Sequence, residues 1–317
     1  MGKIRYYVAL WAAKLSIIAL KITRHNGTNF PGVLALRICP EFLKYIGKPQ
    51  KIIAVTGTNG KTTVSNMLLD MLTMDGKHVM NNKMGSNINS GIASSLIYGA
   101  SLGGRCRYDL GLFEVDERSA LRVYPYLKPD YMLITNLSRD SIMRNAHPEY
   151  IRDILTKYIP KETKLILNAD DLICCGIAPE NPRVYFGIEK MDTDVTDCVN
   201  LINDLQICPQ CHRRLEYEYR RYNHIGRAYC PHCGFKAPAY DYAGCHVARD
   251  HAARDAWSRH NEPDARPHRD GKCRGTRRDA AAAGRGVHGK LFQGNGSSGL
   301  FPRRGCGHGA GGKGKKR

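Results

Sequence analysis

The sequence lacks an uninterrupted apolar run long enough to cross a lipid bilayer. Its apolar N-terminal stretch, residues 4–22, is interrupted by Lys14 and Lys21, whereas a membrane-spanning helix needs about 20 consecutive apolar residues. The pattern predicts an amphipathic helix that docks on its own domain, with a helix lying on a membrane surface as the alternative. The apolar residues that recur at helical spacing are Val8, Trp11, Leu15, Ile18 and Ile22.

The sequence also lacks a small-residue cleavage site after this stretch, which argues against a secretory signal. We therefore expect a cytoplasmic protein, with a peripheral position at the inner face of the plasma membrane as the alternative. Thiols stay reduced in the cytoplasm. The 12 cysteines of the chain therefore indicate metal ligands or free thiols rather than a disulfide framework.

The last quarter of the chain lacks the residues from which a core is built. Residues 245–317 contain no tyrosine and no isoleucine, and 14 of these residues are glycine. Such a composition buries too little apolar surface to offset chain entropy. We expect residues 243–317 to be a low-complexity basic tail, either disordered or the product of an out-of-frame translation. The alternative is a functional basic tail that binds RNA or a membrane.

Acidic residues are scarce, but the imbalance is concentrated in that tail. Residues 245–317 hold 17 basic and 6 acidic residues, a net +11 out of +19 for the chain. A basic charge confined to one end is weak support for nucleic-acid binding by the rest of the protein. No nucleic-acid partner is therefore expected.

Between residues 50 and 190 the chain alternates apolar strands with amphipathic helices. Strands are expected at 51–55, 78–80, 110–115, 131–136, 165–168 and 184–186, and helices at 62–74, 88–98, 119–127 and 149–159. In the first of these helices one face is expected to carry Val64, Met67, Leu68 and Met71. This alternation predicts an α/β domain with a mostly parallel sheet. Four segments follow: an N-terminal helical segment (1–48), a central domain (49–200), a ribbon (201–242) and the tail (243–317).

The stretch KIIAVTGTNGKTT, residues 51–63, has the features of a phosphate-binding loop. A strand ends in a glycine-rich turn that opens a helix, so unpaired backbone N–H groups point toward a bound anion. Lys61 can reach the β- and γ-phosphates, and the Thr62 hydroxyl can bind Mg²⁺. The spacing differs from the common G-x-x-x-x-G-K-[ST] pattern, because Val55 stands at the first glycine position. The expected nucleotide-binding residues are Gly57, Thr58, Asn59, Gly60, Lys61, Thr62 and Thr63.

A second strand, ending in FEVDE at residues 113–117, supplies carboxylates for a metal ion. Ligands of parallel sheets bind at the carboxyl ends of the strands. Strand alternation places Glu114 and Asp116 on one face, so either could bind Mg²⁺. We interpret Glu117 as a helix-start carboxylate.

Two C-x₂-C pairs, Cys208/Cys211 and Cys230/Cys233, are separated by 18 residues. This spacing is typical of a tetrahedral Cys₄ zinc site, and four thiolates leave no position for a catalytic water. The intervening segment LEYEY alternates apolar and acidic residues, as a ribbon strand does. The sequence therefore predicts a structural zinc ribbon, with a redox pair or a disulfide as the alternative.

Five motifs together resemble the central domain of the Mur ligase family. They are TGTNGKTT at 56–63, GSN at 85–87, FEVDE at 113–117, TNLSRD at 135–140 and LNADD at 167–171. Members of this family phosphorylate a carboxylate with ATP and form an amide from the acyl phosphate. The resemblance implies that Lys61 and Glu114 act in catalysis.

The same resemblance implies that Asn136 and Asp140 line the active-site cleft. The chain departs from the family where it reads DSIMRNAH at residues 140–147. We therefore interpret His147 as a solvated residue at a helix entry rather than as a ligand.

A Mur-type domain with an inserted Cys₄ ribbon resembles the Mur-ligase-like subunits of lipid II isoglutaminyl synthases. The resemblance implies ATP, Mg²⁺ and structural Zn²⁺ as cofactors. It implies a heterodimer with a GatD-type glutaminase subunit, and amidation of the D-glutamate α-carboxylate of lipid II to D-isoglutamine. The family's C-terminal domain is expected to be missing, which would make catalysis by the chain weak. The alternatives are an inactive ATP- and zinc-binding fragment and a nucleic-acid-binding NTPase.

Overall fold

A computed structural model describes residues 2–24, 27–83, 85–138, 148–198 and 205–244. Its centre is a seven-stranded sheet in the order β2-β3-β1-β4-β5-β6-β9, in which every neighbouring pair is parallel. The expected α/β fold with a mostly parallel sheet is therefore confirmed. The strands are β1 (Lys51–Thr56), β2 (Val79–Asn81), β3 (Leu110–Glu114), β4 (Tyr131–Ile134), β5 (Lys164–Asn168), β6 (Arg183–Ile188) and β9 (Tyr242–Gly244).

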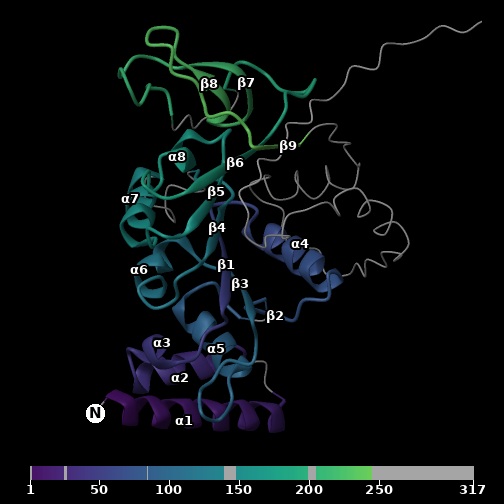
Figure 1. The fold of residues 1–317 in the computed structure, drawn as a ribbon, viewed down its shortest axis with the longest axis vertical. Coiled ribbons are helices and arrows are strands. Elements are labelled where there is room, and N and C mark those ends of the chain that lie inside the picture. Colours follow the sequence, from purple (N-terminus) through teal and green to yellow (C-terminus); the bar gives the residue numbers. More distant parts are fainter. Residues whose placement is uncertain (1, 25–26, 84, 139–147, 199–204, 245–317) are drawn as a thin grey trace, which may run out of the picture. The chain divides into compact units, whose positions relative to one another are not determined.

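Helices cover both faces of this sheet (Figure 1). The helix α4 lies on one face, and α5 to α8 pack on the other. The helices of the central domain are α4 (Lys61–Met74), α5 (Asn89–Gly99), the 3₁₀ turn η1 (Glu117–Ser119), α6 (Ala120–Val123), α7 (Pro148–Tyr158) and α8 (Leu172–Cys175). Among the described residues no helix is both long enough and apolar enough to cross a membrane.

The apolar run of β1 is explained by this two-sided cover. Ile52 and Ala54 belong to the large core under α5 to α8, whereas Ile53 and Val55 belong to the smaller core under α4. Successive side chains of a strand point to opposite faces, so a central parallel strand must be apolar at every position. β1 is an interior strand because β3 and β4 flank it.

The sheet order creates a switch point between β1 and β3. The chain leaves β1 into α4 on one face, and it leaves the neighbouring β3 into η1 and α6 on the other face. Ligands of open α/β sheets bind in the crevice at such a point, beyond the carboxyl ends of the strands. The loops after β1 and β3 carry the glycine-rich turn and the FEVDE carboxylates.

The face that α4 buries differs from the one we expected. Leu72 is its buried residue, and Leu69 packs beside it on the core together with two of the expected residues, Val64 and Leu68. Met67 and Met71, which the apolar period assigned to the inner face, are exposed. The apolar residues of α4 at positions 67, 68, 69, 71 and 72 do not fall on one narrow side of the helix. Packing against the sheet therefore decides which side is buried.

The N-terminal segment folds into α1 (Gly2–Ile22), α2 (Phe30–Ile38) and α3 (Phe42–Tyr45). Helix α1 docks on the domain as expected, but through a different face. The residues buried in α1 are Tyr6, Ala9, Leu10, Ala13, Ser16 and Ile17, and the apolar stripe that the sequence predicted to dock is exposed. Both faces of α1 are apolar. The face that is buried carries alanine and serine, whose small side chains permit close approach to α2 and α5.

The ribbon is an insertion in the sheet. Its hairpin pairs β7 (Glu216–Tyr222) with β8 (Ile225–Tyr229) in antiparallel register. Leu215, Tyr217 and Tyr219 are buried, as their alternation with acidic residues predicted. After the hairpin the chain returns to the central sheet, where β9 pairs in parallel with β6. Strand β9 therefore includes residues 243 and 244, the first two of the expected tail, and the tail from 245 onward lies outside the described residues.

Candidate functional site

The loop between β1 and α4 adopts a conformation that requires glycine at two positions. Gly57 has φ +127°, and a Cβ there would collide with the Thr135 hydroxyl. Gly60 has φ +80° and nothing within 4 Å of the position where a Cβ would lie. Only glycine adopts these angles without strain. The turn therefore leaves an open approach to the N-terminus of α4, where anions bind.

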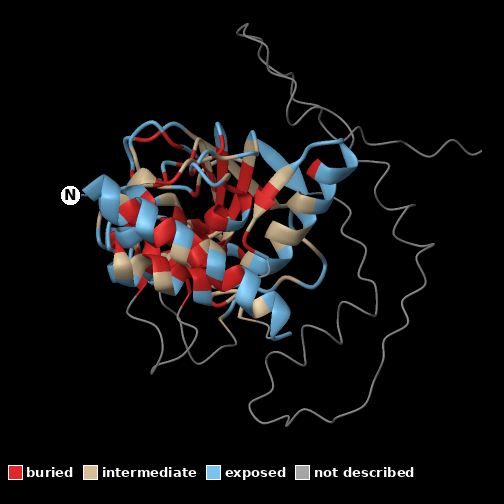
Figure 2. Ribbon diagram, turned by 90° about the horizontal axis from the view of Figure 1, so that it is seen from below, coloured by how far each residue is buried: buried red, intermediate tan, exposed pale blue. Residues whose placement is uncertain are grey.

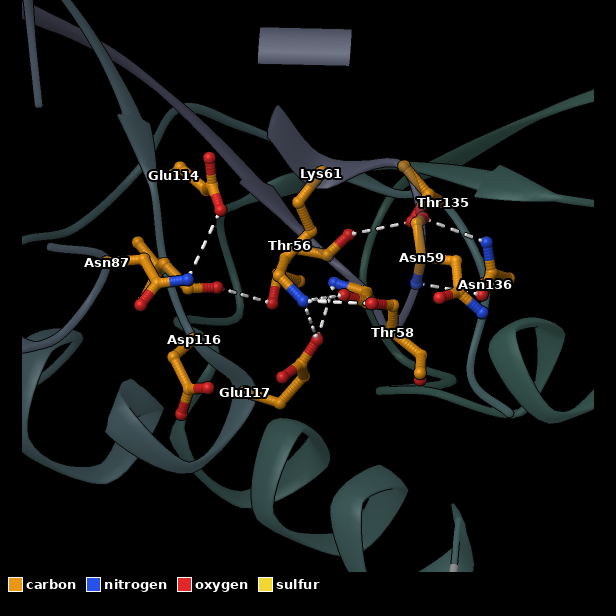
Figure 3. Close-up of polar contacts among 12 residues, drawn as sticks. Thr56, Thr58, Asn59, Lys61, Asn87, Glu114, Asp116, Glu117, Thr135 and Asn136 are labelled. Atoms are coloured by element: carbon orange, nitrogen blue, oxygen red, sulfur yellow. Dashed lines mark hydrogen bonds and ion pairs between the residues drawn. The ribbon is translucent and has the colours of Figure 1, made fainter. Parts of the chain in front are cut away.

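Lys61, the first residue of α4, lies within this turn (Figure 3). Its Nζ donates hydrogen bonds to the carbonyl oxygens of Gly57 and Thr58, the second at 3.1 Å, and forms an ion pair with Glu117 Oε1 at 3.0 Å. The side chains of Lys61 and Glu117 are only 15% and 12% exposed. A lysine held in a shielded position at a helix N-terminus is well suited to bind phosphate oxygens.

Glu117 has a role that the sequence did not indicate. Besides the ion pair, its Oε1 accepts a hydrogen bond from the Gly57 N–H at 3.1 Å. Burial raises the pKa of Glu117, and the ammonium group of Lys61 opposes that rise. The carboxylate thus connects the loop after β3 to both ends of the loop after β1. The sequence shows Glu117 three residues after Glu114, but it does not show the ion pair, because Lys61 belongs to a distant segment of the chain.

The carboxylates of Asp116 and Glu117 bind different partners. The helix-start carboxylate is Asp116, whose Oδ1 accepts hydrogen bonds from the N–H groups of Arg118 at 3.0 Å and Ser119 at 3.3 Å. Glu117 lies in the first turn of η1, where our interpretation placed it, but its carboxylate binds Lys61 and the Gly57 N–H instead of capping the turn. An acceptor immediately before a helical turn caps it, and β3 ends at Glu114, which leaves Asp116 in that position.

Thr62 and Glu114 bring two hard oxygen donors together. The Thr62 hydroxyl donates to Glu114 Oε2 at 2.9 Å, and Asn87 Nδ2 donates to Glu114 Oε1 at 3.2 Å. The Asn82 side chain fixes the backbone of Glu114 through two hydrogen bonds of 2.8 and 2.9 Å. A hydroxyl and a carboxylate beside a phosphate-binding turn are the donors that Mg²⁺ prefers. These two residues fit a magnesium ion.

Asn136 follows β4 and holds the phosphate-binding turn from the other side. Its Oδ1 accepts from the Asn59 N–H at 3.1 Å, and its Nδ2 donates to the Asn59 carbonyl at 3.0 Å (Figure 3). Its own carbonyl accepts from the Thr58 N–H at 2.7 Å. The structure therefore places Asn136 at the site, with its amide engaged by the backbone of the turn. Asp140 and His147 lie outside the described residues.

A cleft of about 260 Å³ lies beside Thr62 and Glu114. Its lining is mostly polar and comes from α4, the end of β2 and the loop before α5; it includes Asn66, Asn81 and Ser86. The cleft thus borders Thr62 and Glu114, the two residues that fit a magnesium ion.

The four cysteines of the ribbon form a cluster in which all sulfur atoms lie within 4.8 Å of one another. The Sγ atoms of Cys208 and Cys233 are 3.6 Å apart, and those of Cys211 and Cys230 are 3.5 Å apart. A tetrahedral ion with metal–sulfur bonds of about 2.3 Å holds its ligands about 3.8 Å apart. The thiols are free, and their spacing fits such an ion.

The two halves of the cluster are built alike. His212 N donates to the Cys208 carbonyl at 3.0 Å, and Gly234 N donates to the Cys230 carbonyl at 3.1 Å. His212 and Gly234 both have positive φ, at +58° and +75°. Desolvation raises the pKa of the Cys230 thiol, but nearby N–H groups outweigh it and lower that pKa to about 7. A thiol of low pKa is a ready metal ligand.

A buried polar cluster joins the ribbon to the central domain. His224, in the hairpin turn, has its Nε2 3.1 Å from Asp171 Oδ1, and both side chains are fully buried. Asp171 Oδ2 accepts from the Leu137 N–H at 2.6 Å and from the Cys174 thiol at 3.2 Å. Leu137 follows Asn136, so this cluster connects the ribbon to the loop that holds the phosphate-binding turn.

Asp171→Asn is expected to lower the free energy of unfolding by about 3 kcal/mol at pH 7, because it breaks a fully buried pair. Burial alone would raise the pKa of Asp171, but His224 and the N–H of Leu137 hold it below the usual value. The stabilisation is therefore present above the pKa of an unfolded aspartate, about 4, and is lost as pH falls through the folded pKa. Urea unfolding at several pH values measures it.

The matched control is Asp153→Asn, because Asp153 is 68% exposed and, within the described part of the chain, pairs with its neighbour Arg152. Exposed pairs contribute little to stability, so this variant should unfold like the parent chain. Equal unfolding curves for Asp171→Asn and Asp153→Asn would contradict the assigned role of the cluster.

Comparison with known proteins agrees with this architecture. Residues 55–206 match the model of the Mur ligase middle domain. The chain therefore contains a Mur ligase middle domain, which confirms the resemblance drawn from the five motifs.

It is homologous in particular to MurT subunits. It is 30% identical over 241 residues, 75% of this chain, to the protein from Staphylococcus aureus named lipid II isoglutaminyl synthase (glutamine-hydrolyzing) subunit MurT. The MurT subunit of Streptococcus pneumoniae is 30% identical over 221 residues, 68% of this chain.

These matches cover 54% and 48% of the two relatives, so the chain spans about half the length of the curated relatives it matches. Among solved structures, MurF from Acinetobacter baumannii matches 53% of this chain and 37% of its own, at 18% identity with a TM-score of 0.38.

Proposed function

We propose that the chain is the ATP-binding, Mur-ligase-type subunit of a lipid II isoglutaminyl synthase that acts in peptidoglycan biosynthesis. The observation that carries the proposal is the placement of Lys61, Thr62 and Glu114 together at the switch point of the sheet. A shielded lysine, a hydroxyl and a carboxylate at that point suit a magnesium-bound nucleoside triphosphate. Homology to MurT subunits supports the proposed substrate and partner.

In this proposal each part of the turn has one task. The N–H groups at the start of α4 and the ammonium of Lys61 bind the β- and γ-phosphates. Thr62 and Glu114 would hold Mg²⁺, and the bound ion would offset negative charge on the phosphates. Glu117 and Asn136 keep the turn in shape through Gly57 and Asn59. They are positioning residues, because their polar atoms contact the turn itself.

The proposed reaction is amide formation through an acyl phosphate. An oxygen of the D-glutamate α-carboxylate of lipid II attacks the γ-phosphorus, and ADP leaves. Ammonia then attacks the acyl carbon, and the bond between this carbon and the phosphate oxygen breaks, so that inorganic phosphate leaves with the electron pair. The nitrogen loses a proton to give the amide of D-isoglutamine. The carboxylate would approach through the cleft beside Glu114 and Thr62, which opens next to the magnesium donors.

The ribbon is proposed to hold one structural Zn²⁺ through Cys208, Cys211, Cys230 and Cys233. Four sulfur donors at tetrahedral spacing suit Zn²⁺ better than Mg²⁺ or Ca²⁺, which prefer oxygen. Because the His224–Asp171 cluster ties the hairpin to the loop beside Asn136, the folded ribbon would also support the nucleotide site.

The ammonia is proposed to come from a glutaminase subunit of the GatD type, bound as a heterodimer, in the cytoplasm. Glutamine hydrolysis by that partner would supply the ammonia at the physiological concentration of ammonium. Ammonium chloride should therefore substitute for the partner and glutamine in a test with purified lipid II and Mg-ATP. This separates the ligase chemistry of this chain from the supply of ammonia.

Glu114→Ala is expected to lower the rate of lipid II amidation by about 100-fold, because it removes a Mg²⁺ ligand worth about 3 kcal/mol in the transition state. Product is measured by mass spectrometry of the released muropeptide, with ammonium chloride as the donor. Glu180→Ala is the matched control, since Glu180 is an exposed glutamate that pairs with Lys161.

Three outcomes of this experiment separate the alternatives. Amidation by the parent chain that is lost in Glu114→Ala supports the proposal. Binding of Mg-ATP without amidation, under either ammonia source, would instead identify an ATP- and zinc-binding protein without ligase activity. Full amidation by Glu114→Ala would overturn the assignment of Glu114 to the metal.

A further inference from the structure

Helix α1 has a second apolar face that the domain does not cover. Six residues, each between 50% and 77% exposed, form a line along the helix, which we call the outer stripe. They recur at alternating spacings of four and three residues, so they share one side of a helix. The outer stripe consists of Ile4, Val8, Trp11, Leu15, Ile18 and Ile22.

A helix that only docks on its own domain has a polar outer face. In α1 the outer face instead exposes large apolar side chains over 21 residues, a length of about 30 Å. A contiguous apolar patch of this kind marks an interaction surface. Figure 2, which views the molecule from the side of α1, shows exposed residues along the helix that starts at the N-terminus.

The lysine in the middle of α1 does not interrupt the outer stripe. Lys14 turns toward the domain, where its Nζ donates to the carbonyl oxygens of Ile97 at 2.5 Å and Ala100 at 2.6 Å. These carbonyls lie at the C-terminus of α5, which attracts a positive charge. The apolar surface also continues beyond the helix, because Trp11 Nε1 donates to the carbonyl of Leu102 at 3.2 Å and Leu102 is 70% exposed.

The segment that carries the outer stripe has charged residues of a single sign. Residues 1–40 contain no aspartate and no glutamate, and they carry six basic residues. These are Lys3, Arg5, Lys14, Lys21, Arg24 and Arg37. An apolar helix face with tryptophan and flanking basic residues is typical of helices that lie in the headgroup region of an anionic bilayer.

We propose that the outer stripe of α1 docks the protein on an anionic lipid surface, with α1 parallel to the membrane plane. The inner face of α1 stays packed on the domain, so the helix joins the protein to the lipid. A second copy of the chain fits this surface less well, because its own stripe is flanked by the same basic residues with no acidic partner. The proposal does not depend on the proposed ligase activity.

The test measures binding of the full chain to vesicles of equal parts phosphatidylglycerol and phosphatidylcholine. The basic residues 245–317 could attract such vesicles by charge alone, so the readout must be local to α1. The chain has two tryptophans, Trp11 and Trp257. In a Trp257→Phe background, Trp11 reports its own surroundings through its fluorescence.

On vesicle binding, the Trp11 emission is expected to shift to shorter wavelength and to be quenched by brominated acyl chains, because the indole enters the lipid interface. Leu15→Glu is expected to lower the partition coefficient about tenfold, since it places a charge in the apolar contact. This difference should persist in about 0.5 M NaCl, where attraction of the tail is screened. Met74→Glu, at an equally exposed apolar position on α4, should bind as the parent does.

The same variants distinguish the lipid surface from other binding partners of the outer stripe. Equal partitioning of Leu15→Glu and its parent, with no shift of Trp11 emission, would overturn the proposal. A dimer in sedimentation velocity that Leu15→Glu converts to monomer, without vesicle binding, would assign the stripe to a second copy. Loss of a glutaminase complex in Leu15→Glu, without vesicle binding by the parent, would assign it to that partner. Ile18→Ser provides a milder variant if Leu15→Glu does not fold, as judged by circular dichroism.

Discussion

Replacing Lys61 with alanine is expected to lower the affinity of the chain for Mg-ATP by about 100-fold. The Lys61 side chain is largely shielded from water and lies at the N-terminus of α4. Charge-assisted hydrogen bonds to phosphate are worth about 1.5–3 kcal/mol each, and about 1.4 kcal/mol corresponds to a tenfold change in affinity. The loss of two such bonds gives the expected magnitude.

Isothermal titration calorimetry with a non-hydrolysable ATP analogue measures this affinity. Lys77→Ala is the matched control, because Lys77 is an exposed lysine beyond the far end of α4 that pairs weakly with Asp75. Removing Lys61 also leaves the buried Glu117 without its ion-pair partner, so thermal unfolding should be recorded for each variant. Equal affinity of Lys61→Ala and Lys77→Ala, with both folded, would show that the turn does not bind the phosphates.

Removal of the metal from the ribbon is expected to unfold it. The ribbon has a small core of its own, consisting of Cys208, Leu215, Tyr217, Ala228 and Cys230. A core of this size does not fold a hairpin by burial alone, and two of its members are proposed metal ligands. Structural zinc sites contribute about 10 kcal/mol or more of binding free energy, which in such modules is also folding free energy.

Metal analysis of protein purified without chelator should give one zinc ion per chain, and Cys230→Ser should lose it. Limited proteolysis is then expected to cut between residues 208 and 233 in the variant but not in the parent. Cys106→Ser is the control, because Cys106 is a free, half-buried cysteine outside the cluster. Protein without stoichiometric zinc, or a ribbon that resists proteases after chelation, would contradict the prediction.

The parts of the fold that the sequence predicted are those with a short-range signal. Strand β1 was visible because a central parallel strand is apolar at consecutive positions, and the turn after it because glycines and Lys61 stand together. The cysteine cluster could be predicted because the two cysteines of each pair are three positions apart in the sequence. In each case the residues that form the feature are neighbours in the chain, so local geometry restricts what they can do.

The sequence by itself thus determined the parallel α/β fold, the position of the glycine-rich turn after β1 and the four cysteines of the cluster. Only the tertiary structure decided which carboxylate caps η1 and which pairs with Lys61, because Asp116 and Glu117 differ by one position and the end of β3 sets their directions. It also decided which face of α1 is buried. A helix that is apolar on both sides has no preferred face until α2 and α5 pack against it, since the hydrophobic effect depends on the area covered and not on the order of residues.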